Sequence, residues 1–168
     1  MKITIPDIII PLIRMIRTKE EKDILRDQIT MLEATLFRPE SEDFENILKT
    51  KLPKHVAAAM RDILSQPQLK ESPTAIKDFF QNVKDTIDTL PILKLSLAFS
   101  PSEEMIERLH EWIGKNLGIG VLLEISYDTL ILGGARIIFQ GRYKELTLSQ
   151  MITDVLAKEK ISVLKLIK

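Results

Sequence analysis

The stretch that decides the fold is VLLEISYDTLILGGARIIFQ, residues 121–140. Apolar side chains alternate with other residues from Val121 to Tyr127, and this period of two is typical of a β-strand. A second strand is predicted from Ala135 to Gln140. Between them stand Gly133 and Gly134. Because glycine adopts positive φ without a steric penalty, the pair predicts a bend that joins the two strands.

The segments on either side extend this pattern. Downstream, the chain can turn at Gly141, and a last helix is predicted from about Thr147, with apolar residues at Met151, Ile152, Val155 and Leu156. The segment Ile161–Ile167 fits either a strand or a helix. Upstream, alternation over residues 93–99 predicts another strand. We therefore expect the C-terminal part to be a small α/β domain with a β-hairpin.

A helix is predicted between the strands at 93–99 and 121–127. The run Ser100-Pro101-Ser102-Glu103 would supply its cap, a first-turn proline and a carboxylate near the positive end of the helix dipole. Its core side would carry Ile106, Leu109, Trp112 or Ile113, and Leu117. Trp112 fits a core position best, although tryptophan is also enriched in partner-facing hot spots.

The first half of the chain has the period of helices. Thr18 and Glu21 have the spacing of a capping box, and the helix that they open is expected to end at Pro39. Further helices are predicted to begin at Ser41, at Pro53 and at Ser72-Pro73.

The N-terminal segment Ile8–Ile16 is apolar on nearly every side. It is either central to the helical bundle or docked onto another chain, and the core position is favoured. Near Leu90-Pro91 the apolar period changes from 3.6 to 2. This change predicts an α+β protein with a helical bundle domain at residues 1–91 and a small α+β domain at residues 92–168.

Composition excludes several classes of function. The 168 residues contain 24 basic and 24 acidic side chains, so the chain lacks the positive charge expected of a nucleic-acid-binding protein. The absence of cysteine excludes disulfides and thiolate chemistry and suits a reducing compartment. The apolar run at Ile8–Ile13 is too short for a membrane span. We expect a soluble cytoplasmic protein with no direct membrane insertion.

Catalytic and cofactor motifs are absent from the sequence. Gly133-Gly134 is not followed by a P-loop pattern, and glycines at a bend explain the pair better. Asp128 is expected to bond the backbone amides of a turn and not to act as a base. His55 and His110 lie in different predicted domains and lack zinc-site spacing. We therefore expect no catalytic residue, metal or cofactor.

The region from about Ile92 to Leu156 resembles the C-terminal region of the delta subunit of rotary F-type ATP synthases, the oligomycin-sensitivity-conferring protein family. Asp128 stands five positions before Gly133, as an aspartate does in that family, and Gly133-Gly134 supplies the family's glycine pair. A strand and a tight turn at Gly141 follow. Glu145 and Thr147 stand where the family has aspartate and serine. The first half departs from the family's alanine- and tyrosine-rich opening helix.

The resemblance implies a non-catalytic stator subunit that keeps the catalytic head from turning with the rotor. Its implied partners are the N-terminal segments of the alpha subunits, bound by the helical domain, and the b subunits of the peripheral stalk, bound by the C-terminal domain. The protein would lie on the cytoplasmic face of the plasma membrane through that complex. The alternative is an unrelated adaptor that scaffolds another complex, and an enzyme has the least support.

Overall fold

The computed structural model describes residues 5–36, 41–67, 69 and 72–155. The predictions at Pro39, Leu156 and Ile161–Ile167 lie outside these residues. The chain divides into two compact units, of which the first contains Met1–Pro91 and Ile113–Leu122 and the second contains Ile92–Trp112 and Leu123–Lys168.

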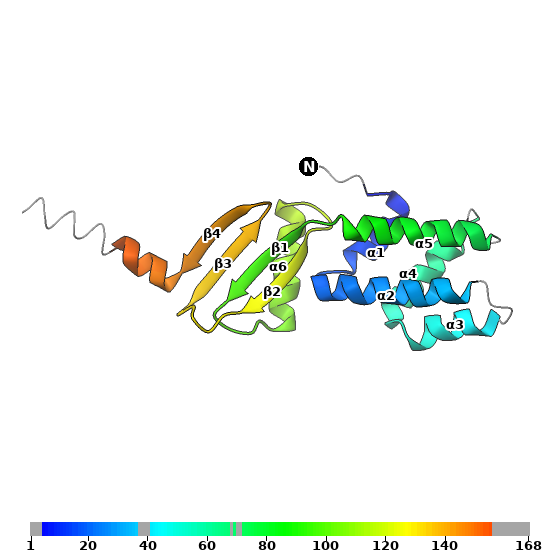
Figure 1. Ribbon diagram of the computed structural model, residues 1–168, viewed down its shortest axis with the longest axis horizontal. Helices are drawn as coiled ribbons and strands as arrows, with labels where there is room; N and C mark the ends of the chain where they lie inside the picture. Colours follow the sequence, from blue (N-terminus) through cyan, green and yellow to red (C-terminus); the bar gives the residue numbers. More distant parts are fainter. Residues whose placement is uncertain (1–4, 37–40, 68, 70–71, 156–168) are drawn as a thin grey trace, which may run out of the picture. The chain divides into compact units, whose positions relative to one another are not determined.

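The first unit is helical (Figure 1). Thr18 and Glu21 form the predicted capping box, since each side chain bonds the other residue's backbone N–H, and the Ser72 hydroxyl accepts a hydrogen bond from the Ala75 N–H. The predicted helix starts at Thr18 and Ser72 are thereby confirmed. The elements are η1 (Asp7–Ile9), α1 (Ile10–Arg14), α2 (Lys19–Thr35), α3 (Ser41–Thr50), α4 (Lys54–Leu64) and α5 (Pro73–Asp88).

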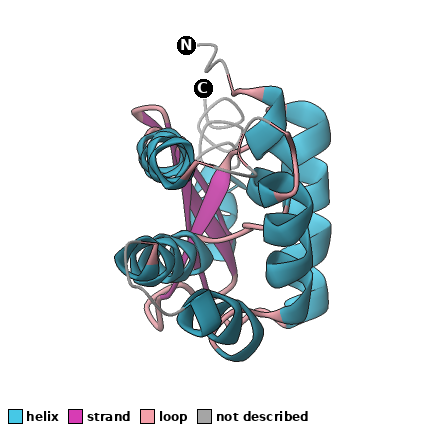
Figure 2. Cartoon of the chain, turned by 90° about the vertical axis from the view of Figure 1, so that its right-hand side faces the viewer, coloured by secondary structure: helices cyan, strands magenta, loops and turns pink. Residues whose placement is uncertain are grey.

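A single apolar cluster holds these helices together, and Figure 2 shows them side by side. The N-terminal segment is part of this core, because Ile9, Leu12, Ile13 and Ile16 are all buried. Phe80 of α5 is also fully buried. Burying one side chain of this size stabilises the fold by about 1.5–3 kcal/mol. The core position favoured for Ile8–Ile16 is therefore confirmed.

The second unit contains a four-stranded sheet in the order β2-β1-β3-β4. The strands and the crossover helix are β1 (Ile92–Leu97), α6 (Glu103–Asn116), β2 (Leu122–Tyr127), β3 (Gly134–Phe139) and β4 (Arg142–Thr147). The end of α6 from Ile113 and the first residue of β2, Leu122, are assigned to the first unit. β1 and β2 run parallel, because Leu122 N–H bonds Pro91 O and Asp128 N–H bonds Leu97 O. β3 is antiparallel to both β1 and β4. The protein therefore combines helices with a mixed sheet, in general agreement with the predicted α+β class.

The strands on either side of the glycine pair are not neighbours, because β1 lies between β2 and β3. In β1, buried leucines alternate with more exposed residues, so one face of the strand is turned to the core. Both edges of the strand remain available for hydrogen bonding to a neighbouring strand. The hairpin is instead β3–β4. Its turn has Gln140 at φ +49° and Gly141 at φ +75°, as a two-residue type I′ turn needs.

α6 differs from its prediction in two respects. It begins at Glu103, and the Ser102 hydroxyl caps the Met105 N–H, so Ser100 and Pro101 precede the helix. Trp112 is 57% exposed whereas Ile113 is 2% exposed. Consecutive residues point about 100° apart around a helix, so only one of the two can face the core. The predicted core position of Trp112 is therefore wrong, and Leu117, which follows the helix, is also exposed.

Candidate functional site

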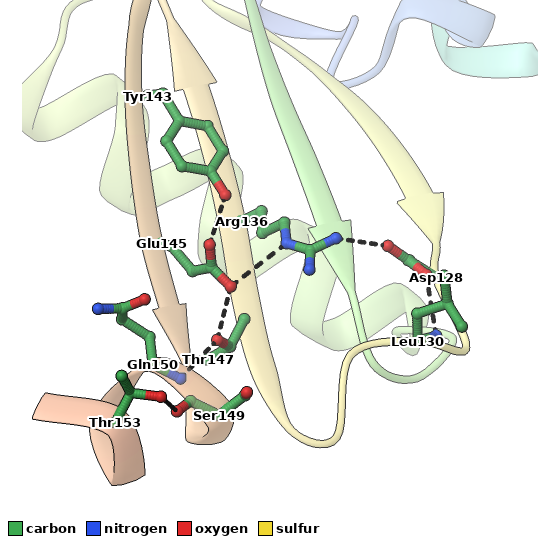
Figure 3. Close-up of polar contacts among 9 residues, drawn as sticks. All are labelled: Asp128, Leu130, Arg136, Tyr143, Glu145, Thr147, Ser149, Gln150 and Thr153. Carbon is green, nitrogen blue, oxygen red and sulfur yellow. Dashed lines mark hydrogen bonds and ion pairs between the residues drawn. The ribbon is translucent and has the colours of Figure 1, made fainter. Parts of the chain in front are cut away.

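A polar network on one side of the sheet centres on Arg136 of β3 (Figure 3). Arg136 Nη1 donates to Asp128 Oδ2 at 2.8 Å, and Arg136 Nε donates to Glu145 Oε1 at 3.5 Å. The antiparallel register places Arg136 directly opposite Glu145. One guanidinium therefore links the residue that follows β2 with a residue in β4.

Asp128 also organises the loop that follows it. Its Oδ1 accepts a hydrogen bond from the Leu130 N–H at 2.9 Å, and its carbonyl accepts one from Ile131 N–H. This is the turn geometry predicted for Asp128. Ile131 is buried and fixes the middle of the loop, whereas Leu130 and Leu132 on either side are highly exposed.

Glu145 connects the network to the helix that follows β4. Its Oε2 accepts from the Tyr143 hydroxyl at 2.6 Å, and its Oε1 accepts from the Thr147 hydroxyl at 2.8 Å. Tyr143, Thr147 and Arg136 stabilise the carboxylate, so the pKa of Glu145 is lowered, and the same carboxylate raises the pKa of Tyr143. Thr147 is buried and its Oγ1 accepts from Gln150 N–H at 3.2 Å, which caps the helix that begins at residue 148.

The glycines of the predicted motif have different roles. Gly134 has φ +93°, and a Cβ there would lie 2.0 Å from the Leu146 carbonyl oxygen, so no other residue fits without backbone movement. Gly133 does not have positive φ, but its carbonyl accepts the Leu148 N–H at 2.9 Å. Gly141 closes the hairpin. The positive φ expected of the pair is therefore confirmed for Gly134 alone.

Residues 148–155 form a helix whose side chains are all exposed. On its polar side Gln150 bonds Asp154, and Thr153 bonds the Ser149 carbonyl. Its other side is an apolar stripe at the spacing i, i+3, i+4 and i+7, made of Leu148, Met151, Ile152 and Val155. An exposed apolar stripe of this kind is suited to an apolar partner.

The described residues contain no cluster that could hold a metal ion. His55 is exposed on α4 and His110 is half-buried on α6. Beside Trp112, α6 carries an open groove of about 550 Å³, lined by Ser102, Glu104, Met105, Arg108, Leu109 and Trp112. Among the helices within the described ranges, none has the length and apolar character needed to cross a membrane.

Asp128, Glu145 and Thr147 were singled out in the sequence, and the network brings them together. Arg136 and Tyr143 were not. Arg136 is the only charged residue of β3, GARIIF, and a charge in an otherwise apolar strand is the signal that could have identified it. Neither a protein-family model nor a curated protein matches this chain.

Proposed function

We propose that this protein is a non-catalytic peripheral-stalk subunit of a rotary F-type ATP synthase, which joins the catalytic head to the b-subunit stalk. The observation that carries this proposal is the apolar stripe on residues 148–155, exposed on a capped helix that directly follows β4. Amphipathic helices bind one another through such stripes at i, i+3, i+4 and i+7. The b subunits would supply the partner helix.

The residues that carry the family resemblance support the same proposal. Asp128 and Glu145 bind one guanidinium, Glu145 accepts the Thr147 hydroxyl, and Gly134 lets β3 pass close to Leu146. A motif whose members share one contact network has a common structural purpose, namely to hold the helix at residues 148–155 on the sheet. In a stator the bound helix must resist torque from the rotor, and a rigid attachment serves that purpose.

The helical unit would bind the N-terminal segments of the alpha subunits, and the sheet unit would bind the b subunits. A helical bundle followed by a small α/β domain is the layout of the delta family. The complex would place the protein on the cytoplasmic face of the plasma membrane. Binding of amphipathic segments requires no strong charge, in agreement with equal numbers of acidic and basic residues.

Affinity purification of the tagged protein from gently solubilised membranes tests the proposal, with mass spectrometry of the proteins that accompany it. Recovery of alpha, beta and b subunits is the expected result. Recovery of a different complex without these subunits would favour the alternative of an unrelated adaptor and would overturn the stator role.

A variant pair tests the surface itself. Met151→Glu places a charge in the centre of the apolar stripe, whereas Thr153→Glu places one on the polar side of the same helix. Losing a central apolar contact of a helix interface costs about 1–3 kcal/mol, or roughly 5- to 150-fold in affinity. We expect Met151→Glu to lose the b subunits and keep the alpha subunits, and Thr153→Glu to keep both. Equal retention of b by the two variants would place the contact elsewhere.

A further inference from the structure

We propose that Arg136 is a positioning residue that holds the loop at residues 128–134 and the helix at residues 148–155 in one fixed relation. The apolar stripe on the helix is then presented in a set direction before any partner arrives. Only the use of that stripe for the b subunits rests on the function proposed above. The positioning role itself concerns the isolated protein.

The geometry of the guanidinium is the first argument. Arg136 uses Nη1 for Asp128 and Nε for Glu145, so the two carboxylates lie on different edges of one planar group. Arginine presents several donors in a rigid fork, whereas lysine has a single ammonium on a flexible stem. A lysine could satisfy either carboxylate but would not fix the angle between them.

The second argument is that each carboxylate has another structural contact. Asp128 also holds the Leu130 N–H and so sets the loop. Glu145 also holds Thr147, which caps the helix through Gln150 N–H. The contacts therefore run from the loop through Arg136 to the first turn of the helix, and they act in parallel with the backbone bond from Leu148 to Gly133.

Removing Arg136 would do more than delete two hydrogen bonds. Asp128 and Glu145 would then face each other as like charges without the cation between them, and both are only partly exposed, at 27% and 25% of the side chain. Their repulsion would push the loop and the base of the helix apart. A partner would next have to restore the arrangement, and the cost of ordering it would reduce affinity.

Spin labelling tests the proposal directly, because the chain has no cysteine and single thiols can be introduced at chosen sites. Leu130→Cys and Ile152→Cys place nitroxides on the loop and on the helix at exposed positions. Double electron–electron resonance should give one narrow distance distribution with Arg136 present. Arg136→Gln should broaden or shift it, and Arg136→Lys should give an intermediate distribution.

Lys94→Gln is the matched control, since it removes the Lys94–Glu124 ion pair at 3.2 Å between β1 and β2 and leaves the Arg136 contacts in place. It should leave the distribution narrow. Should Arg136→Gln not fold, Asp128→Asn and Glu145→Gln weaken the two sides of the guanidinium separately, and each should broaden the distribution. An unchanged narrow distribution in Arg136→Gln, or in both carboxylate variants, overturns the proposal.

The outcome is independent of the stator role. Broadening in Arg136→Gln, together with no b-subunit binding by the parent protein, would keep the positioning role and reject the proposed function. If the parent protein binds the b subunits and the distance distribution of Arg136→Gln is unchanged, the proposed function is kept and the positioning role is rejected. If the positioning role and the stator function are both correct, Arg136→Gln should also weaken binding of the b subunits. The unfolding temperature of the helical unit should not change.

Discussion

The contribution of Arg136 lies in geometry more than in stability. Its side chain is 36% exposed, and its two carboxylate partners are about one quarter exposed. Ion pairs with this much solvent access typically contribute only about 0–1 kcal/mol. A guanidinium that bridges one carboxylate after β2 and another in β4 nevertheless fixes the directions of the residues it joins. We therefore expect substitutions of Arg136 to affect order near residues 128–134 and 148–155 more than overall stability.

Gly134 is the residue at which a side chain is least tolerated. Gly134→Ala would place a Cβ 2.0 Å from the Leu146 carbonyl oxygen at φ +93°. Strain of this kind costs about 1–3 kcal/mol, and the steric overlap adds to it. Denaturant titration should show this loss, whereas Gly114→Ala in α6, where nothing lies within 4 Å of the added Cβ, should be neutral or slightly stabilising. Equal stability of the two variants would contradict the backbone geometry of the bend.

Trp112 is the only tryptophan of the chain, so its fluorescence reports on a single position. At 57% exposure, its emission should be close to that of tryptophan in water, and acrylamide should quench it efficiently. A buried tryptophan would emit at shorter wavelength and resist quenching. Blue-shifted emission in the native protein would mean that Trp112 is buried, as expected from the helical spacing.

Among the elements, helix boundaries were easier to predict than the order of the strands. The starts of α2 and α5 depend on Thr18 and Ser72, whose bonds reach only three residues along the chain. Strand order depends on pairings between distant segments, and alternation in β2 and β3 carries no information on which strand lies between them. The Arg136 network was missed for the same reason, since its contacts follow from the register of β3 with β4.

The start of α2 provides a test at the scale of one element. Thr18→Ala removes the hydroxyl that accepts the Glu21 N–H and should destabilise the protein by about 1 kcal/mol. Thr30→Ala, in the same helix, removes a hydroxyl that only bonds the Arg26 carbonyl and should change stability by less. Comparing the thermal unfolding temperatures of the two variants separates the loss of the helix cap from the general effect of replacing a threonine in α2 or at its start. A larger loss in Thr30→Ala would contradict the role of the cap.

The two units of the whole molecule are built from interleaved stretches of chain. Ile113–Leu122 belongs to the first unit although it follows β1 of the second, and Leu122 is fully buried in the apolar cluster of the helices. Sequence periodicity describes each stretch by its neighbours along the chain. The membership of a stretch in a distant core is set by contacts that periodicity does not encode.

Stability of the whole molecule should fall in acid, and one carboxylate of each unit contributes. Burial opposes ionisation of Glu21, but hydrogen bonds from Arg17 and Thr18 outweigh it, so the pKa of Glu21 is lowered. The pKa of Glu145 is lowered by the contacts with Tyr143 and Thr147. In the unfolded chain both return to the ordinary glutamate value of 4.5. The unfolded state therefore takes up protons first as the pH falls, which favours unfolding.

Stabilisation from these carboxylates is thus present above about pH 4.5 and is lost as the pH falls through their lowered folded-state pKa values. Urea unfolding of the parent protein and of Glu21→Gln across this range checks the sign. We expect Glu21→Gln to be less stable than the parent protein at neutral pH. We also expect it to lose less stability on acidification, because it lacks the carboxylate whose protonation favours the unfolded state. If the free energies of unfolding of the two proteins changed with pH in parallel, the pKa of Glu21 would be the same in the folded and unfolded chain. That result would contradict the stabilisation of the Glu21 carboxylate by its bonds to Arg17 and Thr18.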